Sequence, residues 1–294
     1  MSILVTGSSS YIGKNLINYF EKERIDYIGI DLLKPYTKKC FRISIEDANI
    51  DLKINKKIKT IVHLAAISSD QMSIKDPILS YRVNIFGSMN LIKFAEKKNI
   101  KNFIFASSEW VYGSFKKSES KSIKSQINIE KLNSNYAKTK AIMEKILISS
   151  KKLNYIILRF GIIYGNKISN FSAVESIINQ VKDKNIINVQ SKKTSRSFIH
   201  VEDIVSSIIC SLKLKKKNIL DVQGPYSVSL EMLIKFTSRF INKKVKIVEK
   251  NKKNCSIRLI DSTLSNKILN FKPKISIEKG ISEILKKSKN EKKI

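Results

Sequence analysis

The sequence predicts an α/β protein in which a doubly wound parallel sheet is covered by helices on both faces. Short apolar runs alternate with longer segments whose apolar residues recur at the spacing of an amphipathic helix. The runs lack polar alternation, which is typical of strands buried on both faces of a parallel sheet. A loop of small residues at 6–13 also joins the first run to the first helical segment, as in nucleotide-binding sheets.

The expected elements alternate regularly in the first half of the chain. Each expected strand is a short run rich in Ile, Val, Leu, Phe or Tyr, and each expected helix carries its apolar residues at helical spacing. The expected strands are residues 3–5, 27–30, 41–43, 60–64, 102–106 and 155–159, and the expected helices are residues 11–20, 78–97 and 135–150.

The alternation loosens beyond Gly165, where Pro225 and Pro273 interrupt the pattern. No glycine- or serine-rich linker separates the two parts, so we expect them to pack together. We predict a nucleotide-binding Rossmann domain over residues 1–165, to which residues 196–222 return. Residues 166–195 and 223–294 are predicted to form a smaller C-terminal α/β domain that binds the substrate.

The composition excludes a disordered chain and argues against a nucleic-acid partner. The chain has 294 residues, a net charge of +31 and 42% hydrophobic residues, enough for a packed core. Of the 56 basic residues, 49 are Lys, and they occur as scattered pairs. Because Arg is the usual reader of bases and phosphates, this pattern favours a solvated surface over a nucleic-acid site. A basic field also attracts anionic small substrates.

Cysteine and histidine usage predicts a reduced, cytoplasmic protein without a metal centre. Cys40, Cys210 and Cys255 are odd in number and widely spaced, so they do not form a disulfide framework. His63 and His200 are too few for a histidine cluster, and no cysteine pair has zinc-site spacing. The first residues lack the features of a signal peptide, and no uncharged apolar run reaches the about 20 residues that span a bilayer. We therefore expect no membrane association.

The loop at residues 6–13 is a candidate phosphate-binding loop. Small residues there let the backbone approach a pyrophosphate, whose charge the following helix N-terminus stabilises. Asp31, which ends the second expected strand, can accept hydrogen bonds from a ribose diol and repels a 2′-phosphate, so NAD is preferred over NADP. The alternative for Asp31 is an ordinary surface carboxylate at a strand end. The cofactor-binding candidates in this region are Gly7, Ser10, Tyr11, Ile12, Gly13 and Asp31.

Tyr136 and Lys140 are a candidate acid/base pair, because residues four apart lie on one helix face. A tyrosine that works near pH 7 needs its pKa lowered by about three units, or about 4 kcal/mol. An ammonium about 4 Å away supplies that much at an effective dielectric constant of about 20, before its own desolvation is subtracted. Such a pair also arises by chance in a lysine-rich chain, but its position after a nucleotide loop favours a function. Ser108, which follows the fifth expected strand, either aligns a substrate hydroxyl or simply caps a turn.

Taken together, these motifs resemble the extended short-chain dehydrogenase/reductase family, in its nucleotide-sugar epimerase/dehydratase branch. The resemblance covers nearly the whole chain and includes residues 61–66, 84–87, 158–165 and 196–203. It implies NAD as the cofactor, a nucleotide sugar as the substrate and a homodimer, with His63 and His200 as packing residues. The roles that it implies are catalysis by Ser108, Tyr136 and Lys140, cofactor binding by Leu64, Ala65, Ala66, Tyr136 and Lys140, and substrate binding by Ser108, Glu109 and Arg196.

The chain departs from the family pattern at a few positions. Ser10 replaces the middle glycine of the loop, Ser44 replaces an Asp near the adenine, and Ile162 replaces an Asn that helps to hold the substrate diphosphate. Family dehydratases carry an acidic pair after the Ser or Thr, whereas here the two positions hold Glu109 and Trp110. Since Trp cannot transfer protons, the substitution disfavours 4,6-dehydration.

The resemblance therefore implies epimerisation by transient oxidation. Tyr136 as a phenolate takes a proton from a sugar hydroxyl while hydride passes to NAD, and the ketone turns over before reduction on its other face. Lys140 binds the nicotinamide ribose, and Arg196 holds a phosphate. The alternatives are an NAD(P)-dependent sugar or carbonyl dehydrogenase or reductase that consumes its cofactor, and a non-catalytic NAD(P)- or RNA-binding relative.

Overall fold

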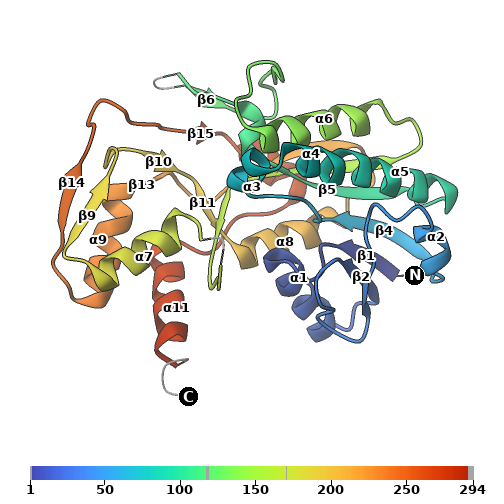
Figure 1. Ribbon diagram of the computed structural model, residues 1–294, viewed down its shortest axis with the longest axis horizontal. Coiled ribbons are helices and arrows are strands. Elements are labelled where there is room, and N and C mark those ends of the chain that lie inside the picture. The colour runs from blue at the N-terminus through green and yellow to red at the C-terminus, as the bar shows by residue number, and fades with distance from the viewer. Residues whose placement is uncertain (1, 117–118, 170, 291–294) are drawn as a thin grey trace.

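A seven-stranded parallel sheet forms the centre of the computed structural model, which describes residues 2–116, 119–169 and 171–290 (Figure 1). The strand order is β12-β7-β5-β4-β1-β2-β3, and every neighbouring pair is parallel. The chain runs from the centre to one edge and then to the other, so the predicted doubly wound sheet is confirmed. The strands are β1 (Ser2–Thr6), β2 (Tyr27–Asp31), β3 (Cys40–Arg42), β4 (Ile58–His63), β5 (Asn102–Ser108), β7 (Asn154–Phe160) and β12 (Asn218–Val222).

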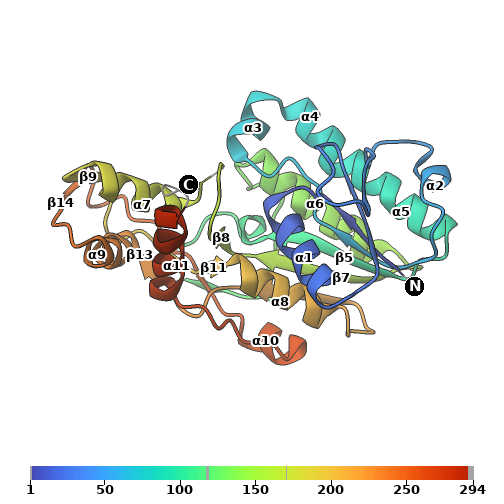
Figure 2. The same cartoon turned by 90° about the horizontal axis from the view of Figure 1, so that it is seen from below.

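Helices cover both faces of this sheet. Helices α1 (Tyr11–Lys22) and α8 (Val201–Ser211) lie against one face, and α5 (Ser88–Lys97) and α6 (Asn135–Ser149) lie against the other (Figure 1). Figure 2 is seen from the side of α1 and α8. Successive strand residues point to opposite faces, so the fully buried Leu4 packs toward α5 and α6, while its neighbour Val5 packs toward α1 and α8. Continuous apolar strands are thus explained by burial on two sides.

The helix expected at residues 78–97 is interrupted. The structure has α4 (Pro77–Tyr81), a π-helical segment η1 (Arg82–Gly87) and then α5. A π-helical turn widens the helix locally and often occurs at functional sites. Here the widened turn carries Asn84, which is 2% exposed and points its side chain into the protein.

A smaller group of elements lies beside the sheet, on the left in Figure 1. Its buried core draws on three helices and on the parallel pair β9–β14. Its elements are α7 (Ala173–Asp183), β9 (Ile186–Val189), α9 (Leu230–Ile241), β14 (Lys246–Glu249) and α11 (Ile277–Asn290). Two pairs of short strands lie nearby: β8 (Ile162–Tyr164) pairs with β11 (Phe198–His200), and β10 (Ser195–Arg196) pairs with β13 (Val228–Ser229).

Helix α10 (Thr263–Leu269) lies within the segment 223–294 that we assigned to the smaller domain, and it contacts α8 and β12. Leu269 and Phe271 accordingly join the core between the main sheet and α8. The remaining elements are α2 (Ile50–Lys53), α3 (Asp70–Lys75), η2 (Glu109–Tyr112), β6 (Ser120–Lys121) and β15 (Leu259–Ile260).

Within the three described stretches of the chain, no helix is both long enough and apolar enough to cross a bilayer.

Candidate active site

The loop after β1 is shaped by two glycines. Gly7 has a φ of 70°, and a Cβ there would lie 2.7 Å from the backbone nitrogen of Ala65. A Cβ on Gly13 would lie 2.1 Å from the carbonyl oxygen of Gly7. Since a side chain at either position would collide with backbone, the loop can pack tightly at the start of α1 only with glycine there. This is the close backbone approach that a pyrophosphate site requires.

Ser10 fits this loop without the conformational freedom of glycine. Its φ of −69° is ordinary for any residue, and it is the N-cap of α1. Its hydroxyl oxygen accepts the Gly13 N–H at 3.1 Å. The substitution therefore adds a helix cap and causes no backbone strain.

Asp31 lies next to the same loop at the end of β2. Its carboxylate accepts the Ser9 N–H at 2.9 Å and the Leu33 N–H at 3.0 Å. These two bonds fix the carboxylate beside the loop, and a carboxylate in this place fits the ribose diol of a dinucleotide. The structure thus brings the predicted acid and the predicted loop together, and the residues fit NAD.

A buried hydrogen-bond chain orders the segment after β4. The Ser88 hydroxyl donates to the Asn84 carbonyl oxygen, so it accepts from His63 Nε2 at 2.7 Å. His63 Nδ1 then accepts from the Thr6 hydroxyl at 2.7 Å, and that hydroxyl accepts the Ala65 N–H. Burial lowers the pKa of His63 to about 3, which keeps the ring neutral in this chain. His63 is therefore a hydrogen-bonded core residue that orders the Ala65 backbone.

Asn84 links this segment to α6. Its side chain accepts the Ile67 N–H at 2.7 Å and donates to the Ile67 carbonyl oxygen at 3.0 Å. It also donates to the Thr139 hydroxyl at 3.0 Å, and Thr139 precedes Lys140. Sequence reasoning assigned Asn84 only to a helix motif, because its partners lie far away in the chain.

The predicted Ser, Tyr and Lys meet at the carboxyl end of β5. Ser108 ends the strand, and its side chain lies close enough to that of Tyr136 on α6 to lower the pKa of the tyrosine. Lys140, one turn further along α6, donates to the Ala106 carbonyl oxygen at 2.7 Å. Its Nζ lies 5.8 Å from the centroid of the Tyr136 ring. The three side chains therefore come together where parallel sheets place ligand groups.

The electrostatics of this group differ from the sequence-based expectation. Burial raises the pKa of Tyr136 to about 12, and its hydrogen bond to Ser108 offsets only part of this effect. Burial also lowers the pKa of Lys140 to about 7, although Glu144 partly counters it. The pKa of Tyr136 in this structure therefore lies above its ordinary value because the side chain is buried, and Lys140 Nζ is directed at the Ala106 carbonyl oxygen.

The Lys140 pKa predicts how stability depends on pH. The pKa of Lys140 lies at 10.5 for a free lysine and at about 7 in the folded chain. Between these two values the unfolded chain binds more protons, so the Lys140 contribution to the free energy of unfolding rises with pH. In a Lys140→Met variant this contribution is absent. We expect the stability of the variant relative to the parent to fall between pH 7 and pH 10 in urea unfolding, whereas a constant difference would contradict the prediction.

Two arginines and one carboxylate lie near Ser108. Glu109 is 1% exposed, and its carboxylate accepts from Arg258 Nε at 3.2 Å. Burial raises the pKa of Glu109, and the charges of Arg258 and Arg196 oppose that rise. Arg196 donates to the carbonyl oxygen of Ser256 at 2.7 Å. Burial and the like charge of Arg258 lower its pKa. Sequence reasoning identified Arg196 and Glu109 but missed Arg258, which follows no recognisable motif.

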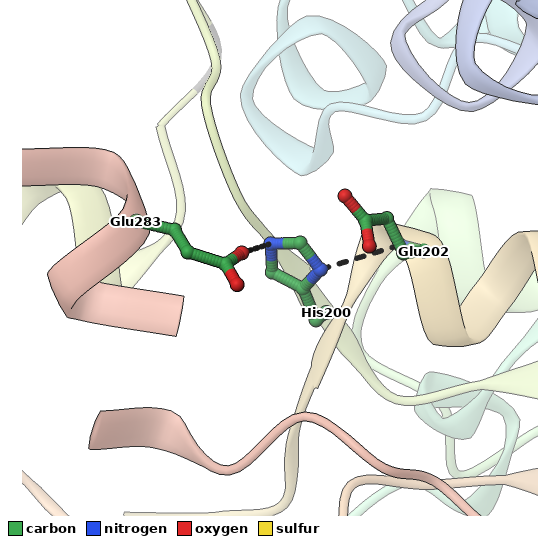
Figure 3. A group of neighbouring side chains, drawn as sticks. All are labelled: His200, Glu202 and Glu283. Atoms are coloured by element: carbon green, nitrogen blue, oxygen red, sulfur yellow. Dashed lines mark hydrogen bonds and ion pairs between the residues drawn. The ribbon is translucent and has the colours of Figure 1, made fainter. Parts of the chain in front are cut away.

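His200, Glu202 and Glu283 form the one cluster of possible metal ligands found among the described residues (Figure 3). Their ligand atoms lie within 4.8 Å of one another. His200 caps α8, because its Nδ1 accepts the Glu202 N–H at 3.4 Å. The proton of the neutral ring is then on Nε2, which faces Glu283 at 3.9 Å. A metal ligand would need that nitrogen free of its proton, so this arrangement favours a cap over a metal site.

The doubly wound sheet, the glycine loop and the acid at the end of β2 fit the extended short-chain dehydrogenase/reductase class. The family model described as the NAD dependent epimerase/dehydratase family matches residues 3–222. The chain belongs to this family, which agrees with the prediction of NAD as the cofactor.

Known proteins are similar to this chain over most of its length. A UDP-glucuronate 4-epimerase of Thermodesulfobacterium geofontis is 25% identical over 312 residues, which cover 97% of this chain and 95% of that relative. A UDP-glucose 4-epimerase of Lactobacillus helveticus is 29% identical over 252 residues, or 76% of this chain and 75% of that protein. The solved UDP-glucose 4-epimerase of Thermotoga maritima with UDP-glucose has a TM-score of 0.86 at 21% identity, covering 99% of each chain. The structural match shows a shared fold.

Proposed function

We propose that this chain is an NAD-dependent epimerase that acts on a nucleotide-activated sugar. The single observation that carries the proposal is the meeting of Ser108, Tyr136 and Lys140 at the carboxyl end of β5, on the sheet that also carries the glycine loop. A protein that only binds a dinucleotide has no need of an acid/base tyrosine in this position. The sequence relatives named above include epimerases of nucleotide sugars, which supports the same substrate class.

Each of the three residues has a distinct task in this proposal. The Tyr136 hydroxyl exchanges a proton with the sugar hydroxyl that becomes a carbonyl, and Ser108 orients that oxygen through its hydroxyl. Lys140 supplies positive charge beside Tyr136 when it is protonated, which favours the phenolate form. The glycine loop and Asp31 would hold NAD, which would supply the reversible hydride transfer that epimerisation needs. Arg196 would hold the anionic diphosphate, because a guanidinium suits phosphate oxygens.

Trp110 supports epimerisation over dehydration. It follows Glu109 in η2 and is 39% exposed, so its ring is available to an apolar face of a sugar. An elimination of water needs a second acid/base group near the sugar. The indole of Trp110 cannot act as such an acid or base, and the carboxylate of the neighbouring Glu109 is hydrogen-bonded to Arg258.

We also propose that two copies of the chain associate through α4, η1, α5 and α6. This side of the molecule exposes several large apolar residues, among them Ile78 (79%), Phe86 (66%), Met89 (44%) and Ile148 (40%). Helix α6 contacts both α4 and η1, so these elements form one continuous surface. Apolar side chains gathered on one face are typical of a protein–protein contact.

The proposal is tested on the purified protein in three steps. Denaturation should release about one NAD per chain, because an enzyme that reoxidises its cofactor in place retains it. Incubation with nucleotide sugars should then interconvert two epimers without net NADH formation. The same preparation should have the mass of a dimer in light scattering. Net NADH accumulation would instead support a dehydrogenase, and a monomer mass would contradict the proposed association.

A further inference from the structure

Arg258 makes an unusual set of contacts with one short segment of the chain. Its Nε donates to the Glu109 carboxylate at 3.2 Å, and its Nη2 donates to the Glu109 carbonyl oxygen at 2.9 Å. Its Nη1 donates to the Gly113 carbonyl oxygen at 2.8 Å. All three nitrogens of the guanidinium therefore bind the Glu109–Gly113 segment, at both of its ends.

Arg258 also stacks on the aromatic ring of Phe115. The guanidinium carbon of Arg258 lies 4.5 Å from the centroid of that ring. Arg stacks on an aromatic face while its N–H groups remain in the plane for hydrogen bonds. The guanidinium of Arg258 is thus hydrogen-bonded in its plane by Glu109 and Gly113 and covered on one face by Phe115.

The segment that Arg258 binds, residues 109–113, follows directly after Ser108. Ser108 is the N-cap of η2, and its hydroxyl oxygen accepts the Trp110 N–H at 3.3 Å. A shift of η2 would therefore move the Ser108 hydroxyl, whose proximity lowers the pKa of Tyr136. A displacement of about 1 Å in such a group can cost about 100-fold in rate.

Arg258 comes from the chain that returns from the smaller group of elements. It precedes β15, which pairs with β6, and its backbone N–H donates to the Ser195 carbonyl oxygen at 3.3 Å. Ser195 immediately precedes Arg196, which in turn donates to Ser256. Arg258 therefore connects the strand of Arg196 to the turn of Ser108.

We propose that Arg258 is a positioning residue that couples the Arg196 strand to the Ser108 turn. This inference rests on the proposed function, in which Arg196 holds the diphosphate and Ser108 orients the reacting oxygen. The hydrogen bonds of Arg258 to Glu109 and Gly113 hold the turn that follows Ser108. Binding at Arg196 is then transmitted to Ser108 through a single side chain.

A lysine could not take the place of Arg258. The three bonds need donors that diverge in one plane, and the stacked face needs a flat cation. An ammonium group keeps the charge opposite Glu109 but can reach only part of this set. Arg258→Lys therefore keeps the positive charge but loses the planar set of hydrogen bonds and the stacking on Phe115.

Trp110 provides a readout that does not depend on activity. It is the only tryptophan of the chain and lies within the segment that Arg258 binds. In Arg258→Met we expect acrylamide quenching of its fluorescence to rise, and Arg258→Lys should lie between that variant and the parent. The matched control is Arg239→Met, an exposed arginine on α9, for which quenching should stay at the parent value. Unchanged quenching in Arg258→Met would overturn the proposal even if the protein has no epimerase activity.

Kinetics then test the coupling to catalysis. In folded Arg258→Met we expect kcat to fall by about 10- to 100-fold while bound NAD stays at the parent level. Arg258→Met with Glu109→Gln removes the buried carboxylate that has lost its partner, so thermal stability should recover while kcat should remain low. Recovery of kcat in that double variant would overturn the proposal, because it would trace the defect to an unpaired charge. If the parent shows no turnover, the proposed function fails, and the fluorescence result still decides the role of Arg258 in the turn.

Discussion

Replacing Tyr136 by Phe is expected to lower the rate of sugar interconversion by about 10³-fold, within the range of about 10²- to 10⁴-fold that a positioned acid/base group contributes. The substitution removes one hydroxyl from α6 and leaves the ring in place. Among the interactions described above, only that of the hydroxyl with Ser108 is lost. The glycine loop and Asp31 lie on other elements, so bound NAD should stay at the parent level.

The measurement compares turnover and NAD content in the same preparation. Tyr226→Phe is a matched control, because it also removes one tyrosine hydroxyl. That hydroxyl donates to Glu278 at 2.5 Å and belongs to a segment 90 residues after Tyr136. The control should retain parent turnover. Parent-like turnover in Tyr136→Phe would remove this residue from the mechanism, and loss of NAD in that variant would point to a role in cofactor binding.

The sheet and the main features of the site could be predicted because they depend on local patterns. A buried parallel strand is a continuous apolar run, and the loop that follows the first strand is recognised by its small residues. Tyr136 and Lys140 are four residues apart, so helical geometry alone places them on one face. Asp31 could be identified from its position at the end of the second expected strand.

Long-range contacts explain what the sequence did not reveal. Arg258 is separated from Glu109 by 149 residues, and Asn84 is separated from Thr139 by 55. Neither pair leaves a local pattern, since a lone Arg or Asn is compatible with many surroundings. The pKa values of the Tyr136–Lys140 pair depend on long-range packing in the same way, because burial raises the pKa of Tyr136 and lowers that of Lys140.

A second set of long-range contacts joins β5, α6 and β7 next to the candidate active site. Glu144 on α6 is 2% exposed and accepts hydrogen bonds from Ser107 and from Arg159 on β7. Arg159 also donates to the Tyr112 hydroxyl at 2.9 Å, and that hydroxyl donates to Asp221 on β12. Burial raises the pKa of Asp221 to about 7. Glu144 is thus the principal counter-charge of a buried arginine.

Replacing Glu144 by Gln is expected to lower the free energy of unfolding by about 3–5 kcal/mol, because it leaves the Arg159 charge buried without its partner. The matched control is Glu46→Gln, whose partner Arg82 has 59% of its side chain exposed. Exposed pairs of this kind contribute about 0–1 kcal/mol. Urea unfolding at pH 7 measures both losses, and equal losses would contradict the prediction. Because Glu144 also raises the pKa of Lys140, the variant should lower that pKa further and leave less positive charge beside Tyr136. The buried ion pair therefore supports both the fold and the charge on which the proposed chemistry depends.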